Sequence, residues 1–330
     1  MLFILTMIIS TLISISSNSW MGMWMGMEIN LLSIIPLMNN SKNILATEAS
    51  IKYFITQALA STILLFAVII MSMNLDFQFK DMSMTLIINS SLLTKMGMAP
   101  FHFWFPEVMQ GMNWTNSLIL LTWQKITPMT IIMYNMKYMQ FFMIIIIISM
   151  IISSIMSMNQ TSLRKILTYS SINHMSWMIS SIFFIESNWT LYFSVYSLIT
   201  TMIIMMFKYL NVYYMKQLIN SLNNNPFLKI MFILNFLSLS GLPPFLGFLP
   251  KWIAIQALVF NDMNFIIMNM VILTLIMMFI YLRMSFSTMM ILTNKLNYNY
   301  FNKWNNSMIM MLNFLTLMSF IMFTLMLNFI

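Results

Sequence analysis

The sequence predicts an all-α, polytopic membrane protein of about eleven transmembrane helices, with inverted repeats that each contain one discontinuous helix. Of its 330 residues, 60% are hydrophobic and 7% are charged, whereas a soluble domain carries about 25% charged residues. Its apolar runs are long enough to cross a bilayer. Two of the runs continue past a Gly/Pro interruption into a further short apolar segment. Interruptions of this kind are typical of discontinuous transporter helices.

We treat residues 1–330 as a single transmembrane domain. No charged n-region with a cleavage site begins the chain, so the first apolar run is expected to be a retained span. The first discontinuous helix is expected at about 82–111, the second at about 226–260 and the final helix at about 308–329. The predicted spans are 2–18, 21–40, 50–73, 82–97, 114–134, 141–158, 165–185, 188–210, 226–242, 264–286 and 308–329.

The cations support this order of spans. With the N-terminus on side one, most of the 15 Lys and Arg residues fall on that side. Loops on the side where a membrane protein is made are rich in Lys and Arg, so side one is predicted to be that compartment. The net charge of +8 is then explained by topology, and no nucleic-acid partner is expected. Side one receives Lys42, Lys52, Arg164, Lys165, Lys208, Lys216, Lys229, Arg283, Lys295 and Lys303, and side two receives Lys80 and Lys137.

Several classes of cofactor site are excluded. The chain has no cysteine, which rules out disulfides, iron–sulfur clusters and thiolate metal sites within it. Its two histidines, His102 and His174, are far apart in the sequence, so haem ligation by this chain alone is not expected. No Gly-x-Gly-x-x-Gly or Walker-type loop is present. We therefore expect neither a cofactor nor a metal in this chain.

The stretch KMGMAPFHFWFPE (95–107) places charged residues beside a predicted break. Gly97 and Pro100 interrupt the helix that Lys95 closes, because proline removes a backbone donor and blocks the preceding turn. A lysine at the centre of a transmembrane helix costs roughly 2.5–3.5 kcal/mol. A functional ion site is the default interpretation of such a charge.

The second interruption repeats the first. GMAPFHFWFPE (97–107) aligns with GLPPFLGFLPK (241–251) at a constant offset, with identical residues at Gly97/Gly241, Pro100/Pro244, Phe101/Phe245 and Pro106/Pro250. Because the two breaks lie five predicted spans apart, they are expected to have opposite orientations, as in inverted-repeat transporters. Chance similarity of turn residues is the alternative explanation.

One acid and three bases are predicted to lie at membrane depth: Glu28, Lys95, Lys125 and Lys251. Burial disfavours the charged form of a lysine, and a nearby carboxylate favours it. A lysine between these influences can gain or lose a proton when its partner moves. Chains of ionisable residues inside membranes are commonly proton relays, so we predict proton transfer by these four residues.

Structural alternatives remain open. Glu28 with one lysine could form a static ion pair, and Lys251 could extend to the membrane surface. His102 could only bind carbonyls that the break frees. His174 could bridge the lysines through water or be a hydrogen-bonded core histidine; both histidines are weaker proton-transfer candidates. Glu107 is expected to cap the broken segment near side one.

At these residues the chain resembles the antiporter-like membrane-arm subunits of respiratory complex I. The segments that carry the resemblance are GMEINLLSIIPLM, TEASIKYFITQA, KMGMAPFHFWFPE, LLTWQKITPM, NQTSLRKILTYSSINHMSWM and SGLPPFLGFLPKW, in this order between residues 22 and 252. The tail from about 290 matches only as an apolar final helix. Mitochondrial members of the family resemble the bacterial form without its first three helices.

The resemblance implies roles for the buried charges. Glu28 would pair with Lys95 of the first broken helix, Lys125 would be the central lysine, and Lys251 the lysine of the second broken helix. Side one would be the mitochondrial matrix, with the protein in the inner membrane. NADH, FMN, iron–sulfur clusters and ubiquinone would bind other subunits. The implied neighbours are chain 4, chain 4L, the lateral helix of chain 5, accessory subunits and lipids such as cardiolipin.

Three functional hypotheses follow. The first is an energy-coupling subunit of a proton-translocating NADH:ubiquinone oxidoreductase, which relays protons while other subunits carry electrons. The second is a stand-alone cation/proton antiporter, which the inverted repeats and buried charges fit equally well. The third is a scaffold whose charges have no role in turnover.

Overall fold

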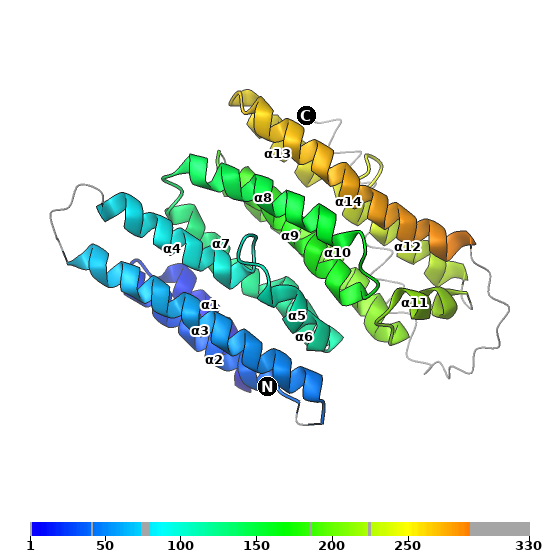
Figure 1. Cartoon of the computed structure of the whole chain (residues 1–330), viewed down its shortest axis with the longest axis horizontal. Coiled ribbons are helices and arrows are strands. Elements are labelled where there is room, and N and C mark those ends of the chain that lie inside the picture. The colour runs from blue at the N-terminus through cyan, green and yellow to red at the C-terminus, as the bar shows by residue number, and fades with distance from the viewer. Residues whose placement is uncertain (1, 41, 74–79, 185, 224–225, 291–330) are drawn as a thin grey trace. The chain divides into compact units, whose positions relative to one another are not determined.

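The computed structural model describes residues 2–40, 42–73, 80–184, 186–223 and 226–290 (Figure 1). Throughout this part of the chain the regular elements are helices, which confirms the all-α prediction. The helices are α1 (Leu2–Ser16), α2 (Trp20–Met38), α3 (Ile44–Ser72), α4 (Lys80–Met96), α5 (Trp104–Gly111), α6 (Trp114–Leu121), α7 (Trp123–Tyr134), α8 (Met139–Ser157), α9 (Leu163–Ile182), α10 (Glu186–Leu210), α11 (Met215–Leu222), α12 (Pro226–Ser240), α13 (Phe248–Phe260) and α14 (Asn264–Met290).

Every predicted span from 2–18 to 264–286 coincides with a helix or a pair of helices. Among the described residues, α2, α3, α8, α10 and α14 are long and apolar enough to cross a membrane. The predicted final span at 308–329 lies outside the described residues, so the total of eleven spans stays a prediction. Two features were not predicted: the short helix α11, and the interruption that separates α6 from α7 at Thr122.

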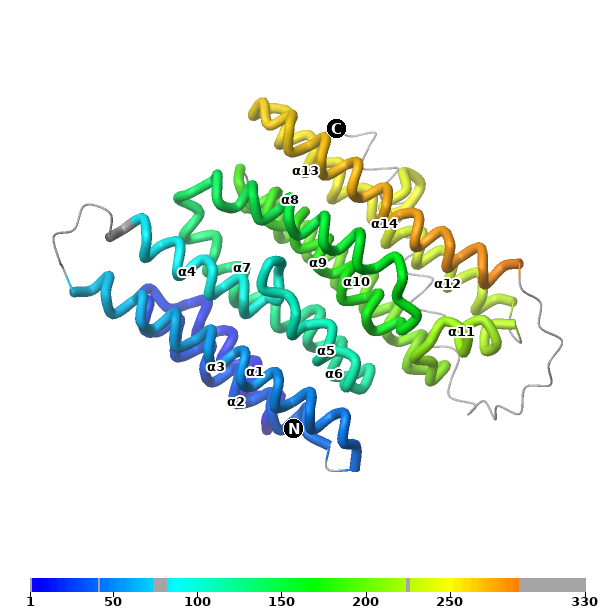
Figure 2. Tube along the Cα trace, viewed as in Figure 1, coloured from blue at the N-terminus to red at the C-terminus, as the bar shows by residue number. Residues whose placement is uncertain are grey.

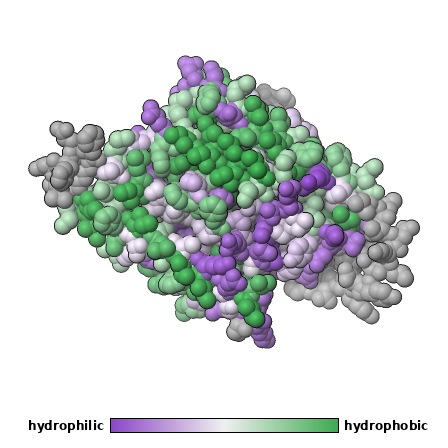
Figure 3. Space-filling view, viewed as in Figure 1, coloured by the Kyte–Doolittle hydropathy of each residue, from purple (hydrophilic) through white to green (hydrophobic). Residues whose placement is uncertain are grey.

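The long helices turn large apolar side chains outward. On α3, Leu59 and Phe66 are 59% and 57% exposed, whereas Gln57 on the same helix is 5% exposed. Figure 3 shows wide hydrophobic areas on this face, with hydrophilic areas between them. Polar side chains kept inside, beneath apolar outer faces, are the arrangement expected of helices whose outer faces meet lipid.

The described residues divide into two compact units, separated between Ser149 and Met150, where the sequence predicts a single domain. In the first unit, α2 packs against α1 and α3, α3 packs against α4 and α5, and α4 packs against α7 (Figure 2). In the second unit, α9 packs against α10, α13 and α14, and α12 packs against α10 and α14. Each unit therefore contains one discontinuous helix within a bundle.

The first break is a helix end of the Schellman type. Gly97 has a φ of 72°, a left-handed conformation in which glycine avoids the steric cost of a side chain. The Met98 N–H donates to the Leu93 carbonyl at 3.1 Å and the Gly97 N–H to the Thr94 carbonyl at 3.2 Å, as this motif requires. The chain then loops through a cis Ala99–Pro100 bond and resumes as α5.

The second break begins with the same type of glycine turn but has no cis peptide bond. Gly241 has a φ of 76°, and its N–H donates to the Ser238 carbonyl at 3.1 Å. The chain resumes as α13 at Phe248, where the first break resumes at Trp104. Both the helix end and the helix restart therefore keep the spacing that aligned the two sequence segments.

Two of the cations assigned to side one bind the ends of helices. Arg283 Nη2 donates to the carbonyl of Met158, just after α8, at 2.7 Å. Lys229 Nζ donates to the carbonyl of Met289, in the last turn of α14, at 3.2 Å. Cations are favourable at these ends because the last carbonyls of a helix carry partial negative charge.

Candidate functional site

Lys125 lies in the first turn of α7 and is 1% exposed. The helix is interrupted three residues earlier, at Thr122, and the Lys125 N–H donates to the Thr122 carbonyl at 3.3 Å. The ammonium lies 5.8 Å from the centre of the Phe105 ring, within the range of a cation–π interaction. Phe105 belongs to α5, the segment that follows the first break, so this break supplies part of the surroundings of Lys125.

Lys95 closes α4 and borders a small polar cavity in the first unit. The centre of a water molecule can move over about 20 Å³ inside it, and roughly 10–15 Å³ is enough to hold one water. Lys125 does not line this cavity, although its neighbours on α7 do. The lining residues are Met27, Asn30, Leu31, Tyr53, Gln57, Lys95, Gln124, Thr127 and Pro128.

Glu28 is partly buried on α2. It is the acid that interacts electrostatically with Lys95. Among the described residues, however, the two do not form an ion pair within 4.0 Å. The structure thus places Glu28 within electrostatic reach of Lys95 without a direct contact. Its expected role as the partner of Lys95 stays a prediction.

Neutral polar side chains that line this cavity form a hydrogen-bonded network beside Lys95. Asn30 Nδ2 donates to Gln124 Oε1 at 3.0 Å, and Gln124 Nε2 donates back to Asn30 Oδ1 at 3.1 Å. The Tyr53 hydroxyl donates to the same Gln124 oxygen at 3.4 Å. Gln57 Nε2 donates to the backbone carbonyl of Lys95 at 3.2 Å. Helices α2, α3, α4 and α7 are therefore joined at this point.

Lys251 lies on α13 in the second unit and is 9% exposed. Its ammonium donates to the carbonyl of Ser240, the last residue of α12, at 2.8 Å. The side chain lies across Gly241, where an added Cβ would come within 2.9 Å of the ammonium nitrogen. The lysine is thus bound inside the unit, rather than extended to the surface as one alternative proposed.

The two histidines are both buried but have different surroundings. His102, in the first break, is 2% exposed; its ring lies 4.5 Å from that of Phe103, and its buried Nδ1 has no hydrogen-bond partner among the described residues. His174, on α9, is 7% exposed, with its Nδ1 3.0 Å from the Tyr192 hydroxyl. The Tyr192 contact fits the alternative of a hydrogen-bonded core histidine for His174, whereas the expected bond from His102 to a freed carbonyl stays a prediction. Their proton-transfer roles stay predictions.

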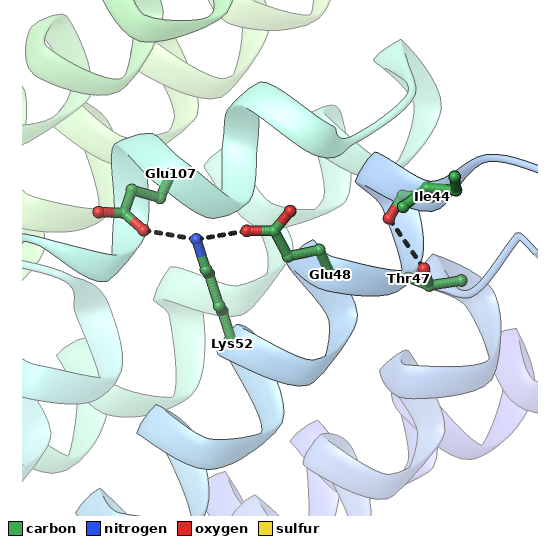
Figure 4. A network of polar contacts seen from close by, with 5 residues as sticks. All are labelled: Ile44, Thr47, Glu48, Lys52 and Glu107. Carbon is green, nitrogen blue, oxygen red and sulfur yellow. Dashed lines mark hydrogen bonds and ion pairs between the residues drawn. The ribbon is translucent and has the colours of Figure 1, made fainter.

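Glu107 lies on α5 and forms an ion pair outside the cavity. Lys52 Nζ is 2.9 Å from Glu107 Oε2 and 2.7 Å from Glu48 Oε1, so the lysine bridges two acids (Figure 4). All three side chains are between 42% and 57% exposed. This bridge connects α5 with the first half of α3, the end assigned to side one.

Comparison with known proteins agrees with this architecture. A family model described as "NADH:quinone oxidoreductase/Mrp antiporter, TM" matches residues 17–277. The chain belongs to this family. Within it, NADH-ubiquinone oxidoreductase chain 2 of Anopheles gambiae is 50% identical over 310 residues, which cover 93% of this chain and 91% of that protein.

Solved structures of low sequence identity share the fold of this family member. A chain of respiratory complex I from Thermus thermophilus with bound aureothin has a TM-score of 0.86 at 19% identity, covering 99% of this chain and 79% of that one. A chain of the Mrp complex from a Dietzia species has a TM-score of 0.75 at 15% identity, covering 86% and 59%. At these identities the likeness shows the fold alone.

Some residues of the site were not predicted from the sequence of this chain. Asn30, Tyr53 and Gln57 line the cavity, and no sequence motif marks them. Their spacing within apolar runs could have identified them. Tyr53, Gln57 and Ser61 recur every four residues on α3, and residues at this spacing share one helix face. A polar stripe on an otherwise apolar span predicts a face turned toward the protein interior.

Proposed function

We propose that this chain is an antiporter-like membrane-arm subunit of a proton-translocating NADH:ubiquinone oxidoreductase, in which Glu28, Lys95, Lys125 and Lys251 transfer protons. The observation that carries the proposal is the polar, water-sized cavity at Lys95, the lysine next to a helix break. A partly buried cation beside such a cavity can exchange its proton with water. The relative from Anopheles gambiae, which carries the name of a chain of this enzyme, supports the same assignment.

In the proposed mechanism, Glu28 acts as the gate. A charge change in a neighbouring subunit moves Glu28 toward Lys95 or away from it. Approach of the carboxylate favours the protonated lysine, and withdrawal favours release of the proton. The released proton passes toward Lys125, and Lys251 exchanges protons with the far side through the second break. The chain thereby couples electrostatic change to proton movement while other subunits carry the electrons.

Replacing Lys125 with methionine tests this function. Methionine has a similar length but no charge, so it removes the proton carrier while filling the buried space. We expect the complex to assemble, because removing a buried charge and filling its place with an apolar group is often neutral or stabilising. The number of protons moved per electron should fall by the whole share that this chain contributes. Proton uptake and NADH oxidation in vesicles that contain the purified complex measure this ratio.

The matched control is Lys137→Met, which removes an exposed lysine close to the C-terminal end of α7. The ratio should be unchanged in this variant. A normal ratio in an assembled Lys125→Met complex would remove Lys125 from the proton path.

The finer surroundings belong to the same proposal. The chain would lie in the mitochondrial inner membrane with its N-terminus in the matrix. Its partners would be chain 4, chain 4L, the lateral helix of chain 5, accessory subunits and lipids such as cardiolipin. The redox groups of the enzyme would be held by other subunits. Cross-linking of the intact complex, followed by mass spectrometry, tests these neighbours.

A second candidate function is a stand-alone cation/proton antiporter. The family description includes Mrp antiporters, and the fold matches a chain of the Dietzia Mrp complex. Purification discriminates between the two functions. Co-migration with a large NADH-oxidising assembly supports the first, whereas a solitary chain or homodimer that exchanges sodium for protons in vesicles supports the second.

A further inference from the structure

We propose that the paired amides of Asn30 and Gln124 form a positioning contact through which α2, the helix of Glu28, sets the location of Lys125. This inference rests on the proposed function, because it describes how the gate reaches the central lysine. It adds a second connection from α2, one that does not pass through Lys95. Asn30 and Gln124 would then be positioning residues that carry no proton themselves.

The contact constrains both helices at two points. Each amide donates to the other, at 3.0 and 3.1 Å, so both groups lie in a fixed relative orientation. The Tyr53 hydroxyl adds a bond of 3.4 Å to the Gln124 oxygen. Asn30 is 4% exposed, and Gln124 is partly buried. Three side-chain bonds from two helices therefore converge on the residue that precedes Lys125.

The backbone at this place makes Lys125 dependent on such a contact. The α6–α7 interruption at Thr122 leaves the first turn of α7 outside a continuous helix. Pro128 has no N–H, so it cannot donate to the Gln124 carbonyl one turn earlier. Hydrogen bonding is thus reduced on both sides of Gln124. Side-chain contacts with α2 and α3 hold this turn instead.

The other end of the contact is coupled to the gate. Asn30 lies two residues from Glu28 on α2, a distance of about 3 Å along a helix axis. A shift or rotation of α2 that moves Glu28 also moves Asn30. Because Gln124 and Lys125 are adjacent in α7, the same movement displaces the lysine relative to Phe105, the ring beneath its ammonium.

A second amide contact in the same unit provides a matched control. Asn89 on α4 and Asn135, at the end of α7, are 0% and 2% exposed. Asn135 Nδ2 donates to Asn89 Oδ1 at 3.0 Å, and Asn89 Nδ2 donates to the Asn135 carbonyl at 3.3 Å. Neither residue lines the cavity at Lys95. Loss of this contact tests the effect of removing a buried amide pair without touching the proposed connection.

The experiment measures protons moved per electron in vesicles containing the intact complex. Asn30→Leu and Gln124→Leu should each lower the proton-to-electron ratio, by at least half of the amount lost in Lys125→Met. The double variant should be no worse than either single one, because both changes break the same contact. Exchanging the two residues, Asn30→Gln with Gln124→Asn, keeps two amides facing each other and should restore the ratio. Asn89→Leu should leave it unchanged.

Each outcome decides between the inference and its alternatives. An unchanged ratio in assembled Asn30→Leu and Gln124→Leu complexes, together with a lowered ratio in Lys125→Met, overturns the positioning contact and leaves the proposed function standing. An unchanged ratio in all three overturns the proposed function itself. An equal loss in Asn89→Leu shows a merely structural effect and also overturns the inference.

A milder variant covers the case in which the leucine variants do not assemble. Asn30→Ser keeps a polar group that is too short to reach Gln124. We expect it to assemble and to lower the proton-to-electron ratio while the rate of NADH oxidation is maintained. An assembled Asn30→Ser complex with a normal ratio overturns the inference.

Discussion

The two helix breaks begin alike, but different side chains satisfy the carbonyls at their helix ends. Each begins with a left-handed glycine, at φ values of 72° and 76°. In the first break, the carbonyl of Lys95 accepts a hydrogen bond from Gln57 at 3.2 Å, and that of Thr94 accepts one from Trp104 Nε1 at 3.0 Å. In the second, the Ser240 carbonyl accepts its bond from the ammonium of Lys251 at 2.8 Å.

Because of this difference, Lys95 and Lys251 make different contacts. The Lys95 carbonyl is satisfied by a neutral amide, so the Lys95 side chain is not needed to satisfy the helix end, and Lys95 lines the cavity. The ammonium of Lys251 is itself the group that satisfies the helix end. In the aligned segments, Lys251 corresponds to Glu107. The repeat thus preserves the glycine turn of the break, while the charge at the equivalent position changes sign.

The largest expected effect comes from a side chain added at Gly241. Alanine in a left-handed conformation costs about 1–2 kcal/mol, and here its Cβ would also displace Lys251, 2.9 Å away. In a double-mutant cycle of Gly241→Ala with Lys251→Met, the losses of stability should be clearly less than additive, because both changes remove the same lysine contact. The midpoint of thermal denaturation of the purified complex measures each loss.

The corresponding cycle at the first break should differ. An added Cβ at Gly97 would meet Phe105 and Trp104 rather than Lys95. Gly97→Ala and Lys95→Met should therefore have additive effects on the denaturation midpoint. Equal coupling energies in the two cycles would contradict the conclusion that Lys251 holds its break and Lys95 does not.

An intermediate effect is expected from removing each lysine alone. Lys251→Met leaves the buried Ser240 carbonyl without its donor, and an unsatisfied buried group costs about 1–3 kcal/mol. Lys95→Met removes no hydrogen bond that holds the break, so the stability of the complex should be unchanged or higher, while its proton-to-electron ratio falls. Thermal denaturation and proton uptake, measured on the same preparations, separate the two effects. Equal destabilisation by both variants would show that Lys95 also has a structural role.

The smallest effect is expected from Glu107→Gln. Glu107 occupies the position equivalent to Lys251, but its bridge to Lys52 is exposed, and exposed ion pairs contribute little to stability. A slight fall in the denaturation midpoint should be seen at low salt and should disappear at high salt, because salt screens exposed charges. A large loss that persists at high salt would mean that the bridge holds α5 in place, as the Lys251 contact holds α13.

The sequence by itself determined the class of fold, the places of the breaks and the identity of the buried charges. These properties are local. Run length and hydropathy specify spans, glycine and proline interrupt them, and a charge inside a span is visible without a structure. Gly97, Gly241 and Lys125 could each be interpreted from a few neighbouring residues.

Tertiary structure alone decided which groups meet. Asn30 and Gln124 are 94 residues apart, and Lys52 and Glu107 are 55 residues apart, and nothing near either residue predicts its partner. Likewise, the direction of the Lys251 side chain depends on how α13 folds back to the end of α12. A break frees backbone carbonyls wherever glycine and proline occur. Which side chain satisfies them depends on helices brought together by packing, and this choice left Lys95 lining a cavity and Lys251 bound to the backbone.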